Sequence, residues 1–102
     1  MTKLALVFII HNSFGRLKFM LEHLEKSNYQ DFEVFIIDNR STDNYRDILM
    51  DYLPDQEFRY DINVVELEEY KPIEYCEERA AEYISKKGIM NTGIYNLTWK
   101  LE

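Results

Sequence analysis

The residues best suited to chemistry directly follow two apolar segments. His11-Asn12-Ser13 comes after the apolar run 4–10, and Asp38 and Asn39 come after the apolar run 32–37. An ionised aspartate can only accept hydrogen bonds, so Asp38 suits a ligand N–H group or a pair of ribose hydroxyls. Asn12 and Asn39 can both donate and accept. These residue types favour recognition of a base or a sugar over a cradle for phosphate.

Each of these side chains also has a structural interpretation. Asp38 could brace the loop that follows it, and a helix cap alone would explain Asn12 or Ser13. For His11 we favour packing or hydrogen bonding within its own turn. Asp43 is expected in the first turn of a helix, where the helix dipole favours a carboxylate. Both interpretations of the strand-end residues therefore stay open at the level of sequence.

Hydrophobic periodicity predicts the elements that must position these residues. Residues 4–10 form a continuous apolar run, which is typical of a strand buried on both faces, and 32–37 and 62–67 are two further predicted strands. Elsewhere, apolar residues recur at the spacing of one helical face. They predict four helices, marked by Leu17, Met20, Leu21 and Leu24; by Tyr45, Ile48, Leu49 and Tyr52; by Ile73, Cys76, Ala80 and Ile84; and by Met90, Ile94, Leu97 and Leu101.

The order of these elements predicts a single α/β domain over residues 1–102. Strands that alternate with helices form a parallel sheet through right-handed crossovers, with helices on its faces. Ligands of such open sheets bind beyond the carboxyl ends of the strands. Three segments follow strands and should meet there: His11-Asn12-Ser13, residues 38–41 and Glu68-Glu69-Tyr70. The candidate residues thus fall where binding is expected.

Composition argues against several classes of function. The chain has 19 acidic and 12 basic side chains among 102 residues, a net charge of −7, which disfavours nucleic-acid binding. Its three glycines, Gly15, Gly88 and Gly93, cannot build a dinucleotide-binding turn or a P-loop. Cys76 is the one cysteine, so no internal disulfide is expected. Without a signal segment or a membrane-length apolar run, we predict a cytoplasmic protein with no transmembrane segment.

Two segments together resemble a known family. IIHNSFGRLKFMLEHL at residues 9–24 and FEVFIIDNRSTDN at residues 32–44 are similar to the opening of family-2-type glycosyltransferases, which have the A-type nucleotide-diphospho-sugar transferase fold. In that family the first strand runs into a (Tyr/His)-Asn-(Ser/Arg) turn, and a later strand ends in Val-Asp-(Asp/Asn)-x-Ser-Thr-Asp. The matching residues here are His11-Asn12-Ser13 and residues 37–43.

The resemblance implies a Rossmann-like, three-layer α/β/α fold with a short, mainly parallel sheet, a partial version of the family's domain. The first strand should be central, with the second and third to one side. By the same resemblance, His11, Asn12 and Ser13 lie against the nucleotide base, and Asp38 and Asn39 join them there. Met90-Asn91-Thr92-Gly93-Ile94 is similar to the family's Arg-Asn-x-Gly-Ile helix beneath the nucleotide-sugar, which adds Asn91 to the nucleotide-binding residues.

The resemblance also implies a metal ion. In the family, the strand after that helix ends in Asp-x-Asp, which holds the Mg²⁺ or Mn²⁺ bridging the donor diphosphate. No Asp-x-Asp follows a predicted strand here, and residue 102 falls where the family's strand is expected to begin. We therefore predict no metal, no cofactor and no catalytic residue in this chain alone. With that strand missing, an exposed sheet edge beside the first strand would invite pairing with a second copy.

Two functions from different classes compete. In the first, the chain is the donor half of a glycosyltransferase, which binds a nucleotide-sugar such as a UDP-sugar and is incomplete for hexosyl transfer alone. In the second, it is a non-catalytic interaction module that dimerises through the exposed edge. An unrelated α/β protein with a coincidental match is the third reading. The first requires the Asp38 carboxylate to face an open crevice shared with the turn after the first strand.

Overall fold

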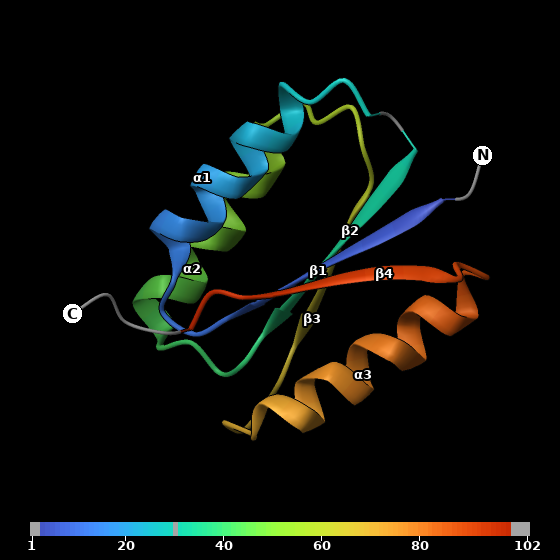
Figure 1. The fold of residues 1–102 in the computed structure, drawn as a ribbon. Coiled ribbons are helices and arrows are strands. Elements are labelled where there is room, and N and C mark those ends of the chain that lie inside the picture. Colours follow the sequence, from blue (N-terminus) through green and yellow to red (C-terminus); the bar gives the residue numbers. More distant parts are fainter. Residues whose placement is uncertain (1–2, 30, 99–102) are drawn as a thin grey trace.

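A parallel sheet lies between helices that cover its two faces (Figure 1). The computed structural model describes residues 3–29 and 31–98. In chain order the elements are β1 (Leu4–Ile10), α1 (Phe14–Glu25), β2 (Phe32–Asp38), α2 (Asp43–Tyr52), the 3-10 helix η1 (Leu53–Asp55), β3 (Ile62–Glu66), α3 (Ile73–Lys86) and β4 (Asn91–Asn96). The strand order is β3-β2-β1-β4, and all three pairs are parallel. Within the described ranges, no helix is both long and apolar enough to cross a membrane.

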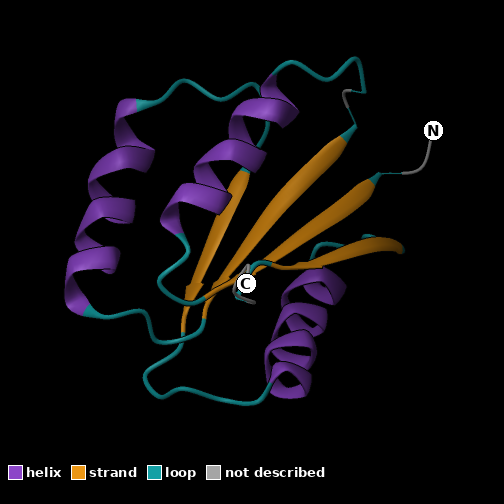
Figure 2. Ribbon diagram, turned by 60° about the vertical axis from the view of Figure 1, so that its left-hand side comes forward, coloured by secondary structure: helices purple, strands orange, loops and turns teal. Residues whose placement is uncertain are grey.

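The predicted α/β class is confirmed, and β1 lies between its neighbours with β2 and β3 to one side. Helices α1 and α2 cover one face of the sheet and α3 covers the other, which gives three layers (Figure 2). β1 and β2 are buried on both faces, as their continuous apolar runs predict. Their side chains divide between two apolar clusters, one under α3 around Val7, Phe35 and Cys76, and one under α1 and α2 around Phe8, Leu17 and Ile36.

The end of the chain departs from the sequence prediction. The helix predicted from Met90 to Leu101 is wrong, because residues 91–96 form strand β4; Leu101 itself lies outside the described residues. The apolar spacing fits a helix, but Thr92, Ile94 and Tyr95 are strand formers, and the intervening glycine weakens a helix. β4 pairs with β1 along its length, so backbone groups on that side of β1 gain partners.

The prediction of an exposed sheet edge beside β1 is therefore also wrong, since β4 pairs with β1 on that side. Strand β4 forms the outer edge of the described sheet on this side. Its side chains are mostly exposed, with Met90 just before it 86% exposed, and Ile94 and Tyr95 46% and 44% exposed.

Tyr60 ties the segment before β3 to α1. Its buried hydroxyl donates a 2.7 Å hydrogen bond to the carbonyl oxygen of Leu21, and burial raises the pKa of that hydroxyl. We expect Tyr60→Phe to lower the free energy of unfolding by about 1 kcal/mol, the usual net value of one such bond. Denaturant unfolding measures the difference. Tyr95→Phe, at an exposed ring, is the control, and equal losses in the two variants would contradict this assignment.

Glu33 is a buried carboxylate with three polar partners. Its oxygens lie 3.2 Å from Lys3 Nζ and 3.0 Å from Lys87 Nζ, and Asn63 Nδ2 donates to it at 2.8 Å. Burial by itself raises the pKa of Glu33, but the hydrogen bond from Asn63 and the two ammonium groups outweigh it. The net pKa lies below its ordinary value of 4.5.

A lowered pKa in the folded state stabilises the fold above the unfolded pKa, and this contribution is lost as the pH falls through the folded value. We therefore expect the free energy of unfolding to fall on acidification below about pH 4.5, and Glu33→Gln to make that fall shallower. Denaturant unfolding across this range measures both slopes. Glu22→Gln, in an exposed pair with Lys18, is the matched control. A slope unchanged by Glu33→Gln would contradict the prediction.

Candidate functional site at the carboxyl edge of the sheet

The sheet register brings the predicted strand-end residues together. Ile10, Asp38 and Glu66 stand opposite one another at the ends of β1, β2 and β3. The turn after β1, the loop after β2 and the segment after β3 therefore meet at one edge, where open parallel sheets bind ligands. Five of the six predicted nucleotide-binding residues lie at this edge: His11, Asn12, Ser13, Asp38 and Asn39.

Asn91 is the exception. It opposes Leu4 at the start of β1, so it stands at the amino end of the sheet, opposite the other five residues. Its backbone belongs to a strand rather than to the helix from which its role was inferred. The structure does not bring Asn91 together with the rest of the predicted site.

The Asp38 carboxylate faces the protein. It is 1% exposed; its Oδ1 accepts a 3.0 Å hydrogen bond from the Ser41 N–H, and its Oδ2 lies 3.3 Å from Arg46 Nε. The contact between Oδ2 and Nε is an ion pair, but its geometry is not that of a hydrogen bond. Asp38 thus does not face an open crevice, and direct contact between its carboxylate and a base gains no support from this geometry. The bracing interpretation accounts for both carboxylate oxygens.

Arg46 connects the end of β2 to the end of β3. From α2, its guanidinium pairs with Glu66 at 3.0 Å as well as with Asp38, and it donates to the carbonyl oxygen of Leu67. The Leu67 N–H in turn donates to the Asp38 carbonyl oxygen at 2.9 Å. The ends of β2 and β3 are therefore locked together by charge and by backbone bonds. Sequence reasoning missed Arg46, which carries no motif of its own.

Asn39 fixes the segment between β3 and α3. Its side chain is fully buried; Nδ2 donates to the Lys71 carbonyl oxygen at 2.8 Å, and Oδ1 accepts from the Lys71 N–H at 2.9 Å. Its own N–H donates to the Ile10 carbonyl oxygen at 2.8 Å. One side chain thus satisfies both polar groups of a loop residue far away in the sequence.

The turn after β1 is held in the same way. His11 Nδ1 donates to the Asn39 carbonyl oxygen at 2.8 Å, and its ring and that of Tyr70 form a T-shaped pair with centroids 4.9 Å apart. Asn12 adopts a left-handed conformation (φ 52°), its N–H donates to Ser41 Oγ at 3.0 Å, and its Oδ1 accepts from the Thr42 N–H at 2.8 Å. Asn12 thereby joins the turn after β1 to the start of α2.

Ser13 occupies the N-cap position of α1, but its hydroxyl does not cap the helix. Instead it donates to the His11 carbonyl oxygen at 2.8 Å and accepts from the His11 N–H at 3.3 Å. His11 and Asn12, which are half-buried, and Tyr70, which is 60% exposed, therefore stay within reach of a ligand at this edge. Tyr70 was placed at the edge by the element order, but no sequence motif singled it out.

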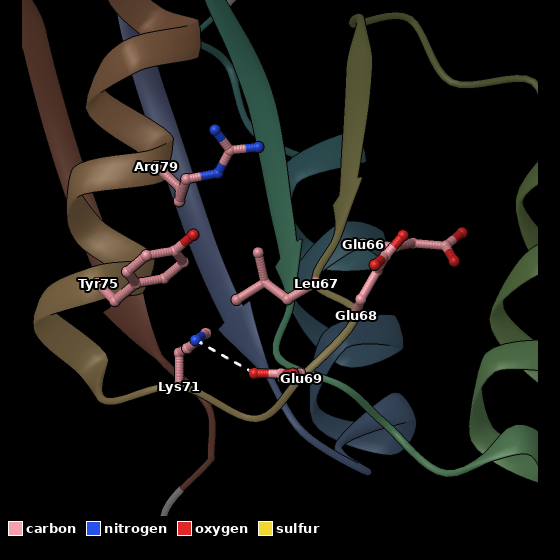
Figure 3. A pocket seen from close by; sticks show the side chains of 7 residues that line it. All are labelled: Glu66, Leu67, Glu68, Glu69, Lys71, Tyr75 and Arg79. Atoms are coloured by element: carbon pink, nitrogen blue, oxygen red, sulfur yellow. Dashed lines mark ion pairs between the residues drawn. The ribbon is translucent and has the colours of Figure 1, made fainter.

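A pocket of about 350 Å³ lies next to this edge, between the segment after β3 and the start of α3 (Figure 3). Tyr75 and Arg79 reach from α3 toward Leu67, and Lys71 pairs with Glu69 at 3.3 Å across the mouth. None of the predicted nucleotide-binding residues lines it. It shares Glu66, Leu67 and Lys71 with the edge, and Lys71 is the residue whose backbone is bonded to the Asn39 side chain.

The described residues at the end of β4 carry no carboxylate that could ligate a divalent cation. The residues there are Asn96, Leu97 and Thr98, and Asn96 Oδ1 accepts hydrogen bonds from the N–H and the hydroxyl of Thr98. The Leu97 carbonyl oxygen accepts from Arg16 Nη1 at 3.1 Å, which places a cation beside this position. Among residues 3–29 and 31–98, no group of three or more His, Cys, Asp or Glu could hold a metal ion.

The contribution of the Asp38–Arg46 pair to the free energy of unfolding can be tested. Arg46→Met leaves a buried carboxylate without its cation, so we expect the free energy of unfolding to fall by about 3–5 kcal/mol. Arg79→Met makes the same substitution in a more exposed pair with Glu82 and should cost only about 0–1 kcal/mol. Denaturant unfolding of the two variants compares them. If Arg46→Met lowered the free energy of unfolding no more than Arg79→Met, the Asp38–Arg46 pair would not be what stabilises the edge.

The comparisons with known proteins identify the family. Residues 5–71, more than half of the chain, match the family model Glycosyl transferase family 2. The searches of curated proteins and of solved structures gave no match. The matched segment runs from β1 to the residue that Asn39 clamps, and so includes the three strand ends of the edge. With its parallel α/β sheet, the chain belongs to glycosyl transferase family 2.

Proposed function

We propose that this chain binds the nucleotide-sugar donor of a glycosyltransferase, such as a UDP-sugar, at the carboxyl edge of its sheet. The observation that carries the proposal is the family match, because residues 5–71 include all three segments that meet at that edge. The edge offers an aromatic ring, an imidazole and amide groups, which suit a base and a ribose.

The predicted residues divide between two roles in this proposal. His11 and Asn12, half-buried at the turn after β1, lie against the nucleotide, and the exposed Tyr70 supplies an aromatic ring for stacking on the base. Asp38, Asn39 and Ser13 are buried and act by holding that surface in shape. We propose this indirect role in place of a direct contact between Asp38 and the base.

We further propose that the 102 residues supply donor binding without hexosyl transfer. The family match ends at residue 71, and the family's acceptor-binding region follows its donor half.

The alternative, an interaction module that dimerises, is favoured by one observation: Met90, Ile94 and Tyr95 are exposed on or beside the outer edge of β4.

Titration by NMR with uridine, UDP and UDP-sugars tests the proposal. We expect shifts confined to the residues after β1, β2 and β3, and about tenfold weaker UDP binding in His11→Ala, the loss of roughly one hydrogen bond to a charged or polar ligand group. His23→Ala, at an exposed position in the last turn of α1, is the matched control. No shift at millimolar ligand, together with a dimer in sedimentation, would instead favour the interaction module.

A further inference from the structure

Strand β4 is the outermost strand on its side of the sheet, and no other strand among the described residues pairs with its outer side (Figure 2). The Leu97 N–H donates to the Ile9 carbonyl oxygen at 2.9 Å, so the odd-numbered residues of β4 turn their backbone groups toward β1. Because these directions alternate along a strand, Thr92, Ile94 and Asn96 turn their N–H and C=O groups outward. A further strand can therefore be added to the sheet at these three residues.

The β4 edge lacks the features that usually keep sheet edges from pairing. Charged residues make up 30% of the chain, but residues 88–98 contain none, and β4 has no proline. The edge at β3 differs, because that strand is mostly half-buried and ends in Glu66, whose carboxylate pairs with Arg46. With a net charge of −7, two copies of this chain repel each other. The uncharged β4 is the edge where a second copy meets the least repulsion.

The side chains of β4 suit a copy of the same strand. Ile94 is 46% exposed and Tyr95 44% exposed, and as neighbours in a strand they point to opposite faces. A twofold axis normal to the sheet pairs residues of the same face. An antiparallel pair centred on Ile94 therefore sets Ile94 against its copy, and Tyr95 opposite Gly93 of the second strand. Gly93 has no side chain to obstruct the incoming ring, and the pairing buries both exposed apolar residues.

We propose that two copies of this chain associate through antiparallel β4 strands centred on Ile94, which joins their four-stranded sheets into one. In this register Ile94 exchanges two backbone hydrogen bonds with its copy, and Thr92 of each strand exchanges two with Asn96 of the other. The interface lies along the side of β4, whereas donor binding is proposed where β1, β2 and β3 end. The inference is therefore independent of donor binding and compatible with it.

Sedimentation of the full 102-residue chain over a concentration series measures the association. We expect a dimer, and we expect Ile94→Lys to weaken it about tenfold or more, because two like charges then lie directly opposite each other. Ile48→Lys, at a position on α2 that is also 46% exposed, is the matched control and should leave the dimer unchanged. Thr92→Pro removes an outward N–H without taking a bond from β1, and it replaces Ile94→Lys if that variant fails to fold.

Amide hydrogen exchange measured by NMR locates the interface. The N–H groups of Gly93 and Tyr95 face β1 and should be protected at every concentration, whereas the three that face outward should gain protection only as the dimer forms. A monomer at millimolar concentration would overturn the inference. So would a dimer that Ile94→Lys weakens no more than Ile48→Lys, or one whose outward N–H groups exchange freely. Chemical shifts on addition of UDP report on donor binding separately.

Discussion

The structure of the edge depends on one buried amide. The Asn39 side chain satisfies both backbone groups of Lys71, and the Asn39 backbone bonds to Ile10 and His11. Each such bond contributes only about 1 kcal/mol net, but a buried amide left without partners costs about 1–3 kcal/mol for each group. The loops after β1, β2 and β3 therefore have little freedom to separate. The surface at this edge therefore rests on rigidly connected loops.

This rigidity changes what the polar residues of the edge mean. A strand that ends in aspartate and asparagine is typical of a ligand-binding site. Here, however, the side chains of Asp38 and Asn39 form hydrogen bonds and an ion pair that join the loops to one another. The groups that stay accessible beside them are those of their neighbours, an imidazole and an aromatic ring. Pre-organisation of this kind lowers the entropy lost on binding, since the groups already hold their places.

Much of the fold was predictable because burial leaves a strong pattern. The run from Leu4 to Ile10 gave the bounds of β1 directly. β4 was missed because its apolar spacing suits a helix, and only pairing with β1, a non-local interaction, decides otherwise. The direction of the Asp38 carboxylate was equally hidden, since its partner Arg46 lies on another element and belongs to no motif.

The pairing of β1 with β4 has a consequence for how the chain reaches this structure. Leu4 lies opposite Asn91, so the side of β1 that faces away from β2 is hydrogen-bonded only once residues 91–96 are in place. Contacts of such long sequence separation pay a large loop-closure entropy and form late. During synthesis, β1, β2 and β3 can assemble first, and β1 stays an open edge until the end. Until β4 pairs with it, that side of β1 presents unpaired backbone groups to other chains.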